Sequence, residues 1–377
     1  MGSGLSQQAV GESSTSLTPT RFHVRFVRDV TELRSLRDDW QHLQADEVSP
    51  FTSLDFICAH VEELRDGDRA RLLGLFEDER LTALAPLILR RRRPRRLSWL
   101  DDESRSSALY LDLDRLEPLV DAIYGLGLPL GAQTLVPDGP TEQALQARRP
   151  RGWVALTRTW LSGPSLPLDH HDPDPLRRLS RNRRSQLRRK LRRAQELGEV
   201  EFRVHRPDED LGDAFDAFVR LEASGWKGRA GTALAHDHQQ RGRLRRYLLT
   251  PEVRSATRIA SMSIEGLTVA MHLDVAAGGR LWSIKTAIDD AYKDVMPGFL
   301  MYEFTIRAAS EEGLTAYEFL GECEPAKEIW GGAPVELHRR RYYPPNVAGL
   351  SALVDEVGRK GVGDLRHRLR ARRGSRS

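Results

Sequence analysis

The first half of the chain alternates between strand and helix periodicity. The stretch RFHVRFVRD alternates apolar and polar residues, which is typical of a strand, and apolar residues then recur at helical spacing over 33–43. RLLGLFEDERLTALAPLIL is typical of two strands joined by a turn around 78–80. A further strand (SALYLDL) and a further helix (LEPLVDAIYGLG) follow. This alternation predicts an α/β domain over residues 21–165.

The second half has longer periodic segments. A helix with the narrow apolar stripe Leu187, Leu191 and Ala194 leads into the strand VEFRVHR and the helix DEDLGDAFDAFVRLEAS. A helix near 236–250 precedes three strands, ATRIASMSIEG, TVAMHLDVAAG and RLWSIKTAID, and the turns between them suit hairpins. The helix FLMYEFTIRAASEEG and the strands TAYEFLG and VELHRRRYY end the series. The predicted order for 176–346 is α-β-α-α-β-β-β-α-β-β.

Three segments lie outside these two domains. Residues 1–20 are rich in Ser, Gly, Thr and Gln, which predicts a disordered tail. Residues 166–175 belong to a stretch rich in Pro, Ser and Asp, which favours an inter-domain linker. The pair His170–His171 in it has no third ligand at a useful spacing, so we expect no metal site. The arginine-rich sequence of residues 347–377 predicts a basic C-terminal helix or tail.

The net charge of +4 at pH 7 conceals an uneven distribution of basic residues. Arginines cluster in 90–96, 177–193 and 359–376, and the rest of the chain is acidic. Such segments meet the phosphates of a cofactor, a nucleic acid or a lipid surface, or they form a solvated helix face. The helix over 177–193 is the candidate for contact with RNA or with an anionic membrane surface.

Other classes of protein are disfavoured by what the sequence lacks. No stretch approaches the roughly 18 consecutive apolar residues of a membrane-spanning helix, and the N-terminus lacks the basic-then-apolar pattern of a secretory signal. Cys58 and Cys323 lie far apart and indicate no disulfide framework. We expect a cytoplasmic protein whose contact with a membrane, if it has one, is peripheral.

The turn before the helix FLMYEFTIRAASEEG is a candidate anion site. Pro297 and Gly298 stand where the helix is predicted to begin, directly after a strand. A helix N-terminus offers unpaired N–H groups and a partial positive charge, and glycine lets a phosphate approach the backbone. Pro-Gly before a helix is also common in ordinary turns, so this signal by itself is weak.

The stretch EASGWKGRAGTAL contains a tryptophan, a lysine and three glycines. It lacks the Gly-Lys-Ser/Thr ending of a phosphate-binding loop. Its glycines predict a mobile flap on which Trp226 stacks on a substrate and Lys227 meets a phosphate or carboxylate. The alternative is a surface loop whose tryptophan packs on the core.

Three motifs, EASGWKGRAGTAL, KTAIDDAYKDVMPG and YEFLGECEPAKEIW, occur in an order and spacing that resemble a known family. The pattern resembles the GNAT-fold acyltransferases of the CelD/BcsL (cellulose biosynthesis) type, which are related to the Fem aminoacyl-transferases. The resemblance is specific over about 175–335 and implies two tandem GNAT-like domains, with the active one C-terminal. The chain has 52 arginines and only 6 lysines, yet Lys227, Lys285 and Lys327 fall within these motifs.

The resemblance implies transfer of an acyl group from acetyl-CoA or another acyl-CoA to an amine or hydroxyl acceptor, in exopolysaccharide or cell-envelope biosynthesis. It makes Asp289 the first choice for general base or acceptor binding and His272 the second, with a satisfied sheet histidine as the alternative. Lys285 and Lys327 are expected to hold anionic parts of donor or acceptor. The remaining expected roles are a cofactor cradle at Met296, Pro297, Gly298, Phe299 and Leu300, and substrate contacts at Trp226, Lys227 and Asp290.

Two departures from the family pattern leave other functions open. Ile288 and Ala326 stand where tyrosines are usual, which puts in doubt any role of those phenols as a general acid. One alternative is a Fem-like ligase that takes aminoacyl-tRNA as donor and grips RNA through the helix at 177–193. Another is a non-enzymatic accessory protein of envelope polysaccharide assembly that holds a membrane surface or a synthase through its basic helices.

Overall fold

The structure is a computed structural model. It describes residues 22–43, 49–91, 94–100, 110–111, 116–207 and 211–358. The tail predicted for 1–20 and the last part of the basic C-terminal segment, 359–377, lie outside these residues. Within the segment predicted for 347–377, residues 347–358 are helical.

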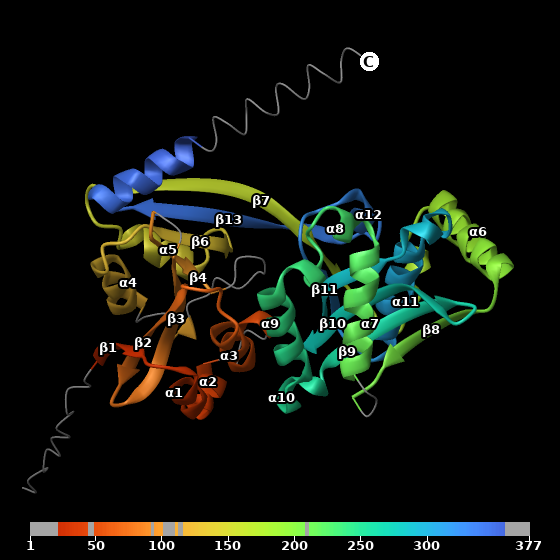
Figure 1. Ribbon diagram of the computed structural model, residues 1–377, viewed down its shortest axis with the longest axis horizontal. Coiled ribbons are helices and arrows are strands. Elements are labelled where there is room, and N and C mark those ends of the chain that lie inside the picture. The colour runs from red at the N-terminus through yellow and green to blue at the C-terminus, as the bar shows by residue number, and fades with distance from the viewer. Residues whose placement is uncertain are drawn as a thin grey trace, which may run out of the picture.

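The first half of the chain builds one end of the molecule, drawn from red to yellow in Figure 1. Its elements are β1 (Phe22–Val27), α1 (Val30–Ser35), α2 (Arg37–Leu43), η1 (Pro50–Thr52), α3 (Leu54–Glu62), β2 (Arg69–Glu77), β3 (Arg80–Arg90), β4 (Arg96–Trp99), β5 (Tyr110–Leu111), α4 (Leu116–Gly125), β6 (Leu130–Leu135), α5 (Pro140–Ala147) and β7 (Val154–Pro167).

The second half builds the other end. Its elements are η3 (Pro175–Arg178), α6 (Arg181–Leu197), β8 (Val200–His205), α7 (Leu211–Ser224), α8 (Trp226–Arg229), η4 (Leu234–His236), α9 (His238–Leu249), α10 (Pro251–Arg254), β9 (Thr257–Ile264), β10 (Leu267–Ala277), β11 (Arg280–Ile288), η5 (Asp290–Val295), α11 (Pro297–Glu311), β12 (Ala316–Phe319), α12 (Pro325–Glu328) and β13 (Ala333–Tyr343). Leaving aside the shortest helices, the order predicted for this half is confirmed.

In the described part of the chain, thirteen strands form one sheet in the order β1-β2-β3-β4-β6-β13-β7-β12-β11-β10-β9-β8, with β5 paired to β3. The two ends of the sheet repeat one scheme, because three antiparallel pairs are followed by a parallel step, β4–β6 or β11–β12. A helix, α4 or α11, lies between the strands of each parallel step along the chain. The mixed α/β architecture predicted from the sequence is confirmed.

The two ends are joined by an exchange of strands. β7 comes from the first half of the chain but pairs with β12, and β13 comes from the second half but pairs with β6. The two exchanged strands also pair with each other from Ala333↔Ser165 to Tyr343↔Val154, and Figure 1 shows them running together across the molecule. Leu166 and Pro167, at the start of the predicted linker, therefore belong to a strand.

Local sequence explains most of the turns that bring the strands together. The hairpin between β2 and β3 has positive φ at Asp78 and Glu79, and the one between β9 and β10 has positive φ at Glu265 and Gly266. Two successive residues with positive φ are typical of the two-residue turns that match strand twist. The turns predicted at these places are confirmed.

Apolar side chains from the helices fill both faces of the sheet. In the second half, one cluster joins α7 and α9 to the sheet, and another joins α6 and α11 to it. The first of these clusters also contains Phe51 and Phe56 from the first half of the chain, so the two ends share a core. None of the described helices is both long enough and apolar enough to cross a membrane.

Candidate functional site

The parallel step of the second half opens into a cavity. β11 and β12 pair only from Arg280↔Ala316 to Ser283↔Phe319, after which β12 ends and β11 continues to Ile288. The register between β10 and β11 shifts at the same level, because Leu273 pairs with Lys285 and Asp274 with Ser283. The extra residue, Ile284, forms a bulge, which bends a strand locally. A cavity of about 660 Å³ lies where the strands part.

Both halves of the chain supply walls of this cavity. The second half contributes β11, α8, the start of α11 and the segment from β12 into α12. The first half contributes the aromatic side chains Phe51, Phe56 and Trp160. Arg243 from α9 and Arg339 from β13 add cationic groups to the lining. The cavity is therefore an apolar space with a few charged side chains, as small-molecule sites usually are.

The turn into α11 closes one end of the cavity. Met296 has the left-handed conformation (φ 54°) and Pro297 occupies the first turn of the 15-residue helix. A Cβ added at Gly298 would meet the Ile288 Cγ2 at 3.5 Å and no closer atom, so the glycine leaves the backbone accessible. Met296 to Phe299 line the cavity, whereas Leu300 is buried in the core, and the cofactor cradle stays a prediction. The Phe299 N–H donates to the Met296 carbonyl oxygen at 3.0 Å. The Gly298 N–H and the positive end of the helix dipole make the turn suitable for phosphate.

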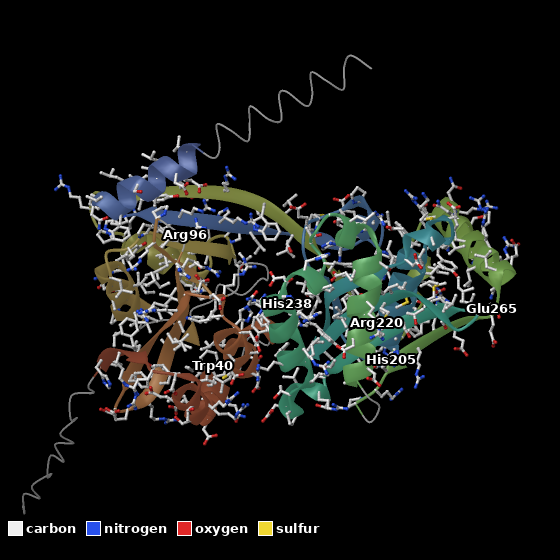
Figure 2. All side chains as sticks on the ribbon, viewed as in Figure 1. Trp40, Arg96, His205, Arg220, His238 and Glu265 are labelled. Carbon is white, nitrogen blue, oxygen red and sulfur yellow. The ribbon has the colours of Figure 1, made fainter. Side chains whose placement is uncertain are left out.

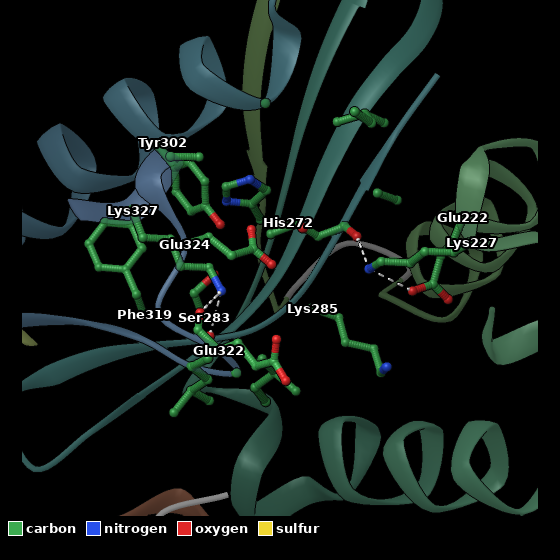
Figure 3. Close-up of a pocket in the computed structure, with 18 of the residues that line it drawn as sticks. Glu222, Lys227, His272, Ser283, Lys285, Tyr302, Phe319, Glu322, Glu324 and Lys327 are labelled. Atoms are coloured by element: carbon green, nitrogen blue, oxygen red, sulfur yellow. Dashed lines mark hydrogen bonds and ion pairs between the residues drawn. The ribbon is translucent and has the colours of Figure 1, made fainter. Parts of the chain in front are cut away.

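Lys227 lines the cavity but is held by the protein. Its Nζ donates to Glu222 Oε1 at 3.1 Å and to the carbonyl oxygen of Thr286 at 2.7 Å, as Figure 3 shows. The Glu222 side chain is fully buried and also accepts from the Leu234 N–H at 2.7 Å. The part of the predicted flap around Lys227 is the short helix α8, which the ion pair ties to α7 and the hydrogen bond to Thr286 ties to β11. Trp226 is half exposed at the rim of the cavity.

The other two predicted lysines also line the cavity. Lys327 donates from Nζ to the carbonyl oxygens of Leu320 and Glu322, both at 2.9 Å, and burial lowers its pKa. It therefore stabilises the loop between β12 and α12. Lys285 lies on β11 and points away from Lys227 and from His272 in Figure 3.

His272 and Tyr302 form a buried pair on the cavity wall. The His272 side chain is fully buried, and its Nδ1 and Nε2 have no hydrogen-bond partner among the described residues. Burial, assisted by the nearby Lys227 charge, lowers the pKa of His272 to about 3, so the ring is neutral. The ring of Tyr302 from α11 stands edge-on to it, with centroids 4.8 Å apart (Figure 3). Burial raises the pKa of Tyr302, which keeps its hydroxyl protonated.

Two more buried polar groups lie behind this pair. Asp274 follows His272 by two residues on β10 and faces Ser283 across the bulge. Neither the Asp274 carboxyl oxygens nor the Ser283 hydroxyl has a hydrogen-bond partner among the described residues. Burial raises the pKa of Asp274 to about 8, so this carboxyl group is mainly protonated at neutral pH. Unpaired buried polar groups cost stability, and in native proteins they are typical of functional sites.

The two acidic residues expected at the site are placed elsewhere. Asp289 caps η5, where its Oδ1 accepts from the Ala291 N–H at 2.9 Å, and Asp290 pairs with Arg229 at 2.5 Å. Neither residue lines the cavity. Asp289 does lie at the end of the strand, as predicted, but its carboxylate serves the turn that follows. No group of three His, Cys, Asp or Glu side chains within the described segments is arranged to hold a metal ion.

Several residues in or beside the cavity are not among the predicted site residues. Tyr302 lies four residues after Gly298, so the predicted helix start already placed both on one helix face. Asp274 had a similar signal, because it shares a strand face with His272. Phe51, Phe56 and Trp160 had none, because nothing local indicates that the first half of the chain reaches the cavity.

Comparison with known proteins agrees with this arrangement. Residues 181–328 match the family model described as Acetyltransferase (GNAT) domain. The structure of FemX has a TM-score of 0.56 at 13% identity, covering 84% of this chain and 96% of FemX. A tandem GNAT protein from the clavulanic acid biosynthesis pathway has a TM-score of 0.50 at 11% identity, covering 86% of this chain and 99% of that protein. The chain has the GNAT fold.

The structural likeness to the tandem GNAT protein extends over both halves of this chain and not only over residues 181–328. Identities this low establish the fold and leave the substrate to be argued from the site. Among curated proteins, none matches the sequence.

Proposed function

We propose that the protein transfers an acyl group from an acyl-CoA thioester to an amine or hydroxyl acceptor in the cavity beside β11. The observation that carries this proposal is the parting of β11 from β12 beside the N-terminus of α11. This geometry combines an exposed strand edge, a phosphate-suited turn and buried proton-transfer groups in one cavity. A GNAT domain is consistent with acyl-CoA as the donor.

The donor would lie along β11. Beyond Ser283 this strand has β10 on one side and the cavity on the other, so its backbone can pair with the amide groups of a pantetheine arm. The pyrophosphate would then reach the turn from Met296 to Phe299, where helix N–H groups and the side chain of Lys293 line the cavity. The thioester would lie near His272 and Tyr302, farther along the wall.

The buried pair supplies the proton transfers. As the acceptor attacks the thioester carbonyl, its nitrogen or oxygen becomes acidic, and the neutral ring of His272 takes the released proton. The carbon–sulfur bond then breaks, the hydroxyl of Tyr302 protonates the departing thiolate, and the proton held by His272 passes to Tyr302, so both groups return to their neutral forms. A weak base is sufficient for the first step because the proton leaves only as the new bond forms. Tyr302 thus offers a phenol at the site although Ile288 and Ala326 do not.

The acceptor would enter against the wall from the first half of the chain. Phe51, Phe56 and Trp160 offer flat apolar faces, and Arg243 and Arg339 offer positive charge. Such a wall suits an amphiphilic acceptor with a sugar or acyl face and an anionic group. An acceptor of the cell envelope, as the sequence resemblance implies, has this chemistry.

Binding of the donor can be tested with a bulky residue in the turn. Gly298→Trp fills the space beside Ile288 and should abolish stabilisation by acetyl-CoA, which for the native protein reaches about 2.7 kcal/mol at a hundredfold excess over Kd. Gly125→Trp is the matched control. Gly125 is the last residue of α4 in the other half, and a Cβ added there would meet no atom within 4 Å. Thermal shift with acetyl-CoA, coenzyme A and RNA gives the readout.

The expected result is stabilisation of the native protein and of Gly125→Trp by coenzyme A and acetyl-CoA, and none of Gly298→Trp. Circular dichroism checks that Gly298→Trp is folded. Equal stabilisation of Gly298→Trp and Gly125→Trp by acetyl-CoA would show that the turn is not part of the donor site. Stabilisation of the native protein by RNA alone would overturn the acyl-CoA proposal.

A further inference from the structure

The basic helix α6 lies at the end of the molecule farthest from the first half of the chain (Figure 1). Leu187 and Ala194 are buried against α11 and the sheet, which fixes the opposite face of the helix toward solvent. That face carries exposed arginines. We call them the arginine face: Arg181, Arg188, Arg189, Arg192 and Arg193.

The arginine face has no acidic partner. In the part of the chain that the structure describes, none of its five side chains forms an ion pair, and Glu196 is the only acidic residue of α6. Elsewhere on the surface, arginines such as Arg148, Arg245 and Arg246 pair with carboxylates. Ion pairs are therefore common among the surface arginines of the described residues, whereas the five side chains of the arginine face have none.

Charges spaced in this way repel one another. Arg188 and Arg192 are one helical turn apart, as are Arg189 and Arg193, and like charges at this spacing destabilise a helix. Helix α6 is held in place by its buried stripe, and the repulsion persists until a polyanion approaches. An extended anionic surface would relieve it at all five positions together.

Exposed leucines at the end of α6 distinguish a lipid surface from RNA. Leu197, the last residue of the helix, is 54% exposed, and Leu267, at the start of β10, is 62% exposed. The two segments are in contact, because the Glu199 N–H donates to Glu265 Oε1 at 2.8 Å, and Figure 2 shows Glu265 at this end of the molecule. RNA would leave both leucines in water, whereas a bilayer buries apolar side chains at the headgroup boundary.

We propose that the arginine face, together with Leu197 and Leu267, docks the protein on an anionic phospholipid bilayer. Docking would also place the cavity near the lipid, because Gln186 of α6 contacts the sulfur of Met296 at 3.7 Å and Lys190 bonds to the carbonyl oxygen of Asp294. Met296 lines the cavity at its phosphate-suited end.

The test is sedimentation with phosphatidylcholine vesicles that contain or lack phosphatidylglycerol. Each basic side chain near an anionic leaflet contributes about 1 kcal/mol, so Arg188→Gln/Arg192→Gln should bind the anionic vesicles about thirtyfold more weakly. Arg149→Gln/Arg151→Gln is the control, since it removes the same charge from exposed sites in the other half and should bind as the native protein does. Binding should weaken with added salt and be absent on pure phosphatidylcholine.

A second variant tests the apolar part of the surface. Leu197→Ser/Leu267→Ser should weaken vesicle binding while leaving any binding to RNA unchanged. Equal vesicle binding by the arginine-face and control variants would overturn the proposal, as would binding of the native protein to RNA but not to anionic vesicles. Stabilisation by acetyl-CoA, measured on the same variants, should be unaltered, so docking and acyl transfer can fail independently.

Discussion

The two ends of the sheet can be compared residue by residue. Their parallel steps end at the pairs Ser98↔Gly131 and Ser283↔Phe319. Across the neighbouring strand, Ser98 faces Ile88 and Ser283 faces Asp274. The first end thus buries a hydrocarbon side chain at the position where the second buries a carboxyl group.

The pairing register of β3 with β4 differs from that of β10 with β11 at the next residue pair. At the first end, Leu87↔Trp99 follows Ile88↔Ser98 without interruption, whereas at the second end the bulge at Ile284 intervenes. The described residues leave a space of about 40 Å³ at the first parallel step and another of about 590 Å³ beside Ile88 and Leu100, compared with about 660 Å³ at the second parallel step. Trp99 is buried in the apolar cluster of the first end.

This difference shows that strand order alone does not make a binding site. Around the first parallel step, the same topology has an apolar side chain facing Ser98 and a continuous register. It forms a cavity when one extra residue turns a strand aside and polar groups take the central positions. Each prediction below changes one end and uses the other as its control.

The largest expected effect is on kcat. It compares α11 with α4, the helices that lie between the strands of the two parallel steps along the chain. Tyr302→Phe in α11 should lower kcat about a thousandfold, because it removes the proposed proton donor to the thiolate. Tyr124→Phe in α4 removes a buried hydroxyl that donates to the Leu145 carbonyl oxygen at 2.6 Å, so it should cost about 1 kcal/mol of stability and leave kcat unchanged. Steady-state kinetics and urea unfolding of both variants provide the check, and an unchanged kcat in Tyr302→Phe would contradict its assignment.

A smaller effect, on stability, is expected at Lys227. Lys227→Met leaves the carboxylate of Glu222 buried without its cation, which should cost about 3 kcal/mol in the free energy of unfolding. Adding Glu222→Gln should recover part of this loss. Arg148→Met, at an exposed ion pair in the first half, should produce no measurable change. If Lys227→Met is as stable as the native protein, the ion pair does not anchor α8.

The smallest expected effect is the dependence of the free energy of unfolding on pH. The folded-state pKa of Asp274, about 8, lies above its unfolded value near 3.9. The folded protein therefore holds a proton that the unfolded chain has released, and stability falls as pH rises through this window. His272, with a folded pKa of about 3, acts in the opposite sense, but only below its unfolded pKa near 6.5.

Between about pH 7 and 8 the Asp274 contribution should thus be isolated, at about 1 kcal/mol per pH unit. Urea unfolding should show that slope in the native protein and lose it in Asp274→Asn. Ile88→Val, at the matching position of the first end, should lower stability by about 1 kcal/mol equally at both pH values. A slope that persists in Asp274→Asn would assign the pH dependence to another group.

Much of the second half could be predicted from periodicity and turn residues. The order of its helices and strands follows from local patterns, and the Pro297–Gly298 pair marks the start of α11. His272, Lys227, Lys285 and Lys327 all line the cavity, and the roles expected for them stay predictions. Asp289 does not, because a carboxylate just before a short helix is drawn to the backbone N–H groups of that helix.

The sequence by itself determined the elements, the hairpin turns and the helix that begins at Pro297, because these depend on neighbours within a few residues. Only the tertiary structure decided the exchange of β7 and β13, the bulge at Ile284 and the role of Lys227. Strand pairing between distant segments and the burial of Glu222 depend on which surfaces meet in the folded protein. Residue periodicity does not predict those contacts, because it depends only on neighbours in the sequence. The cavity, which both halves of the chain line, is a product of those non-local contacts.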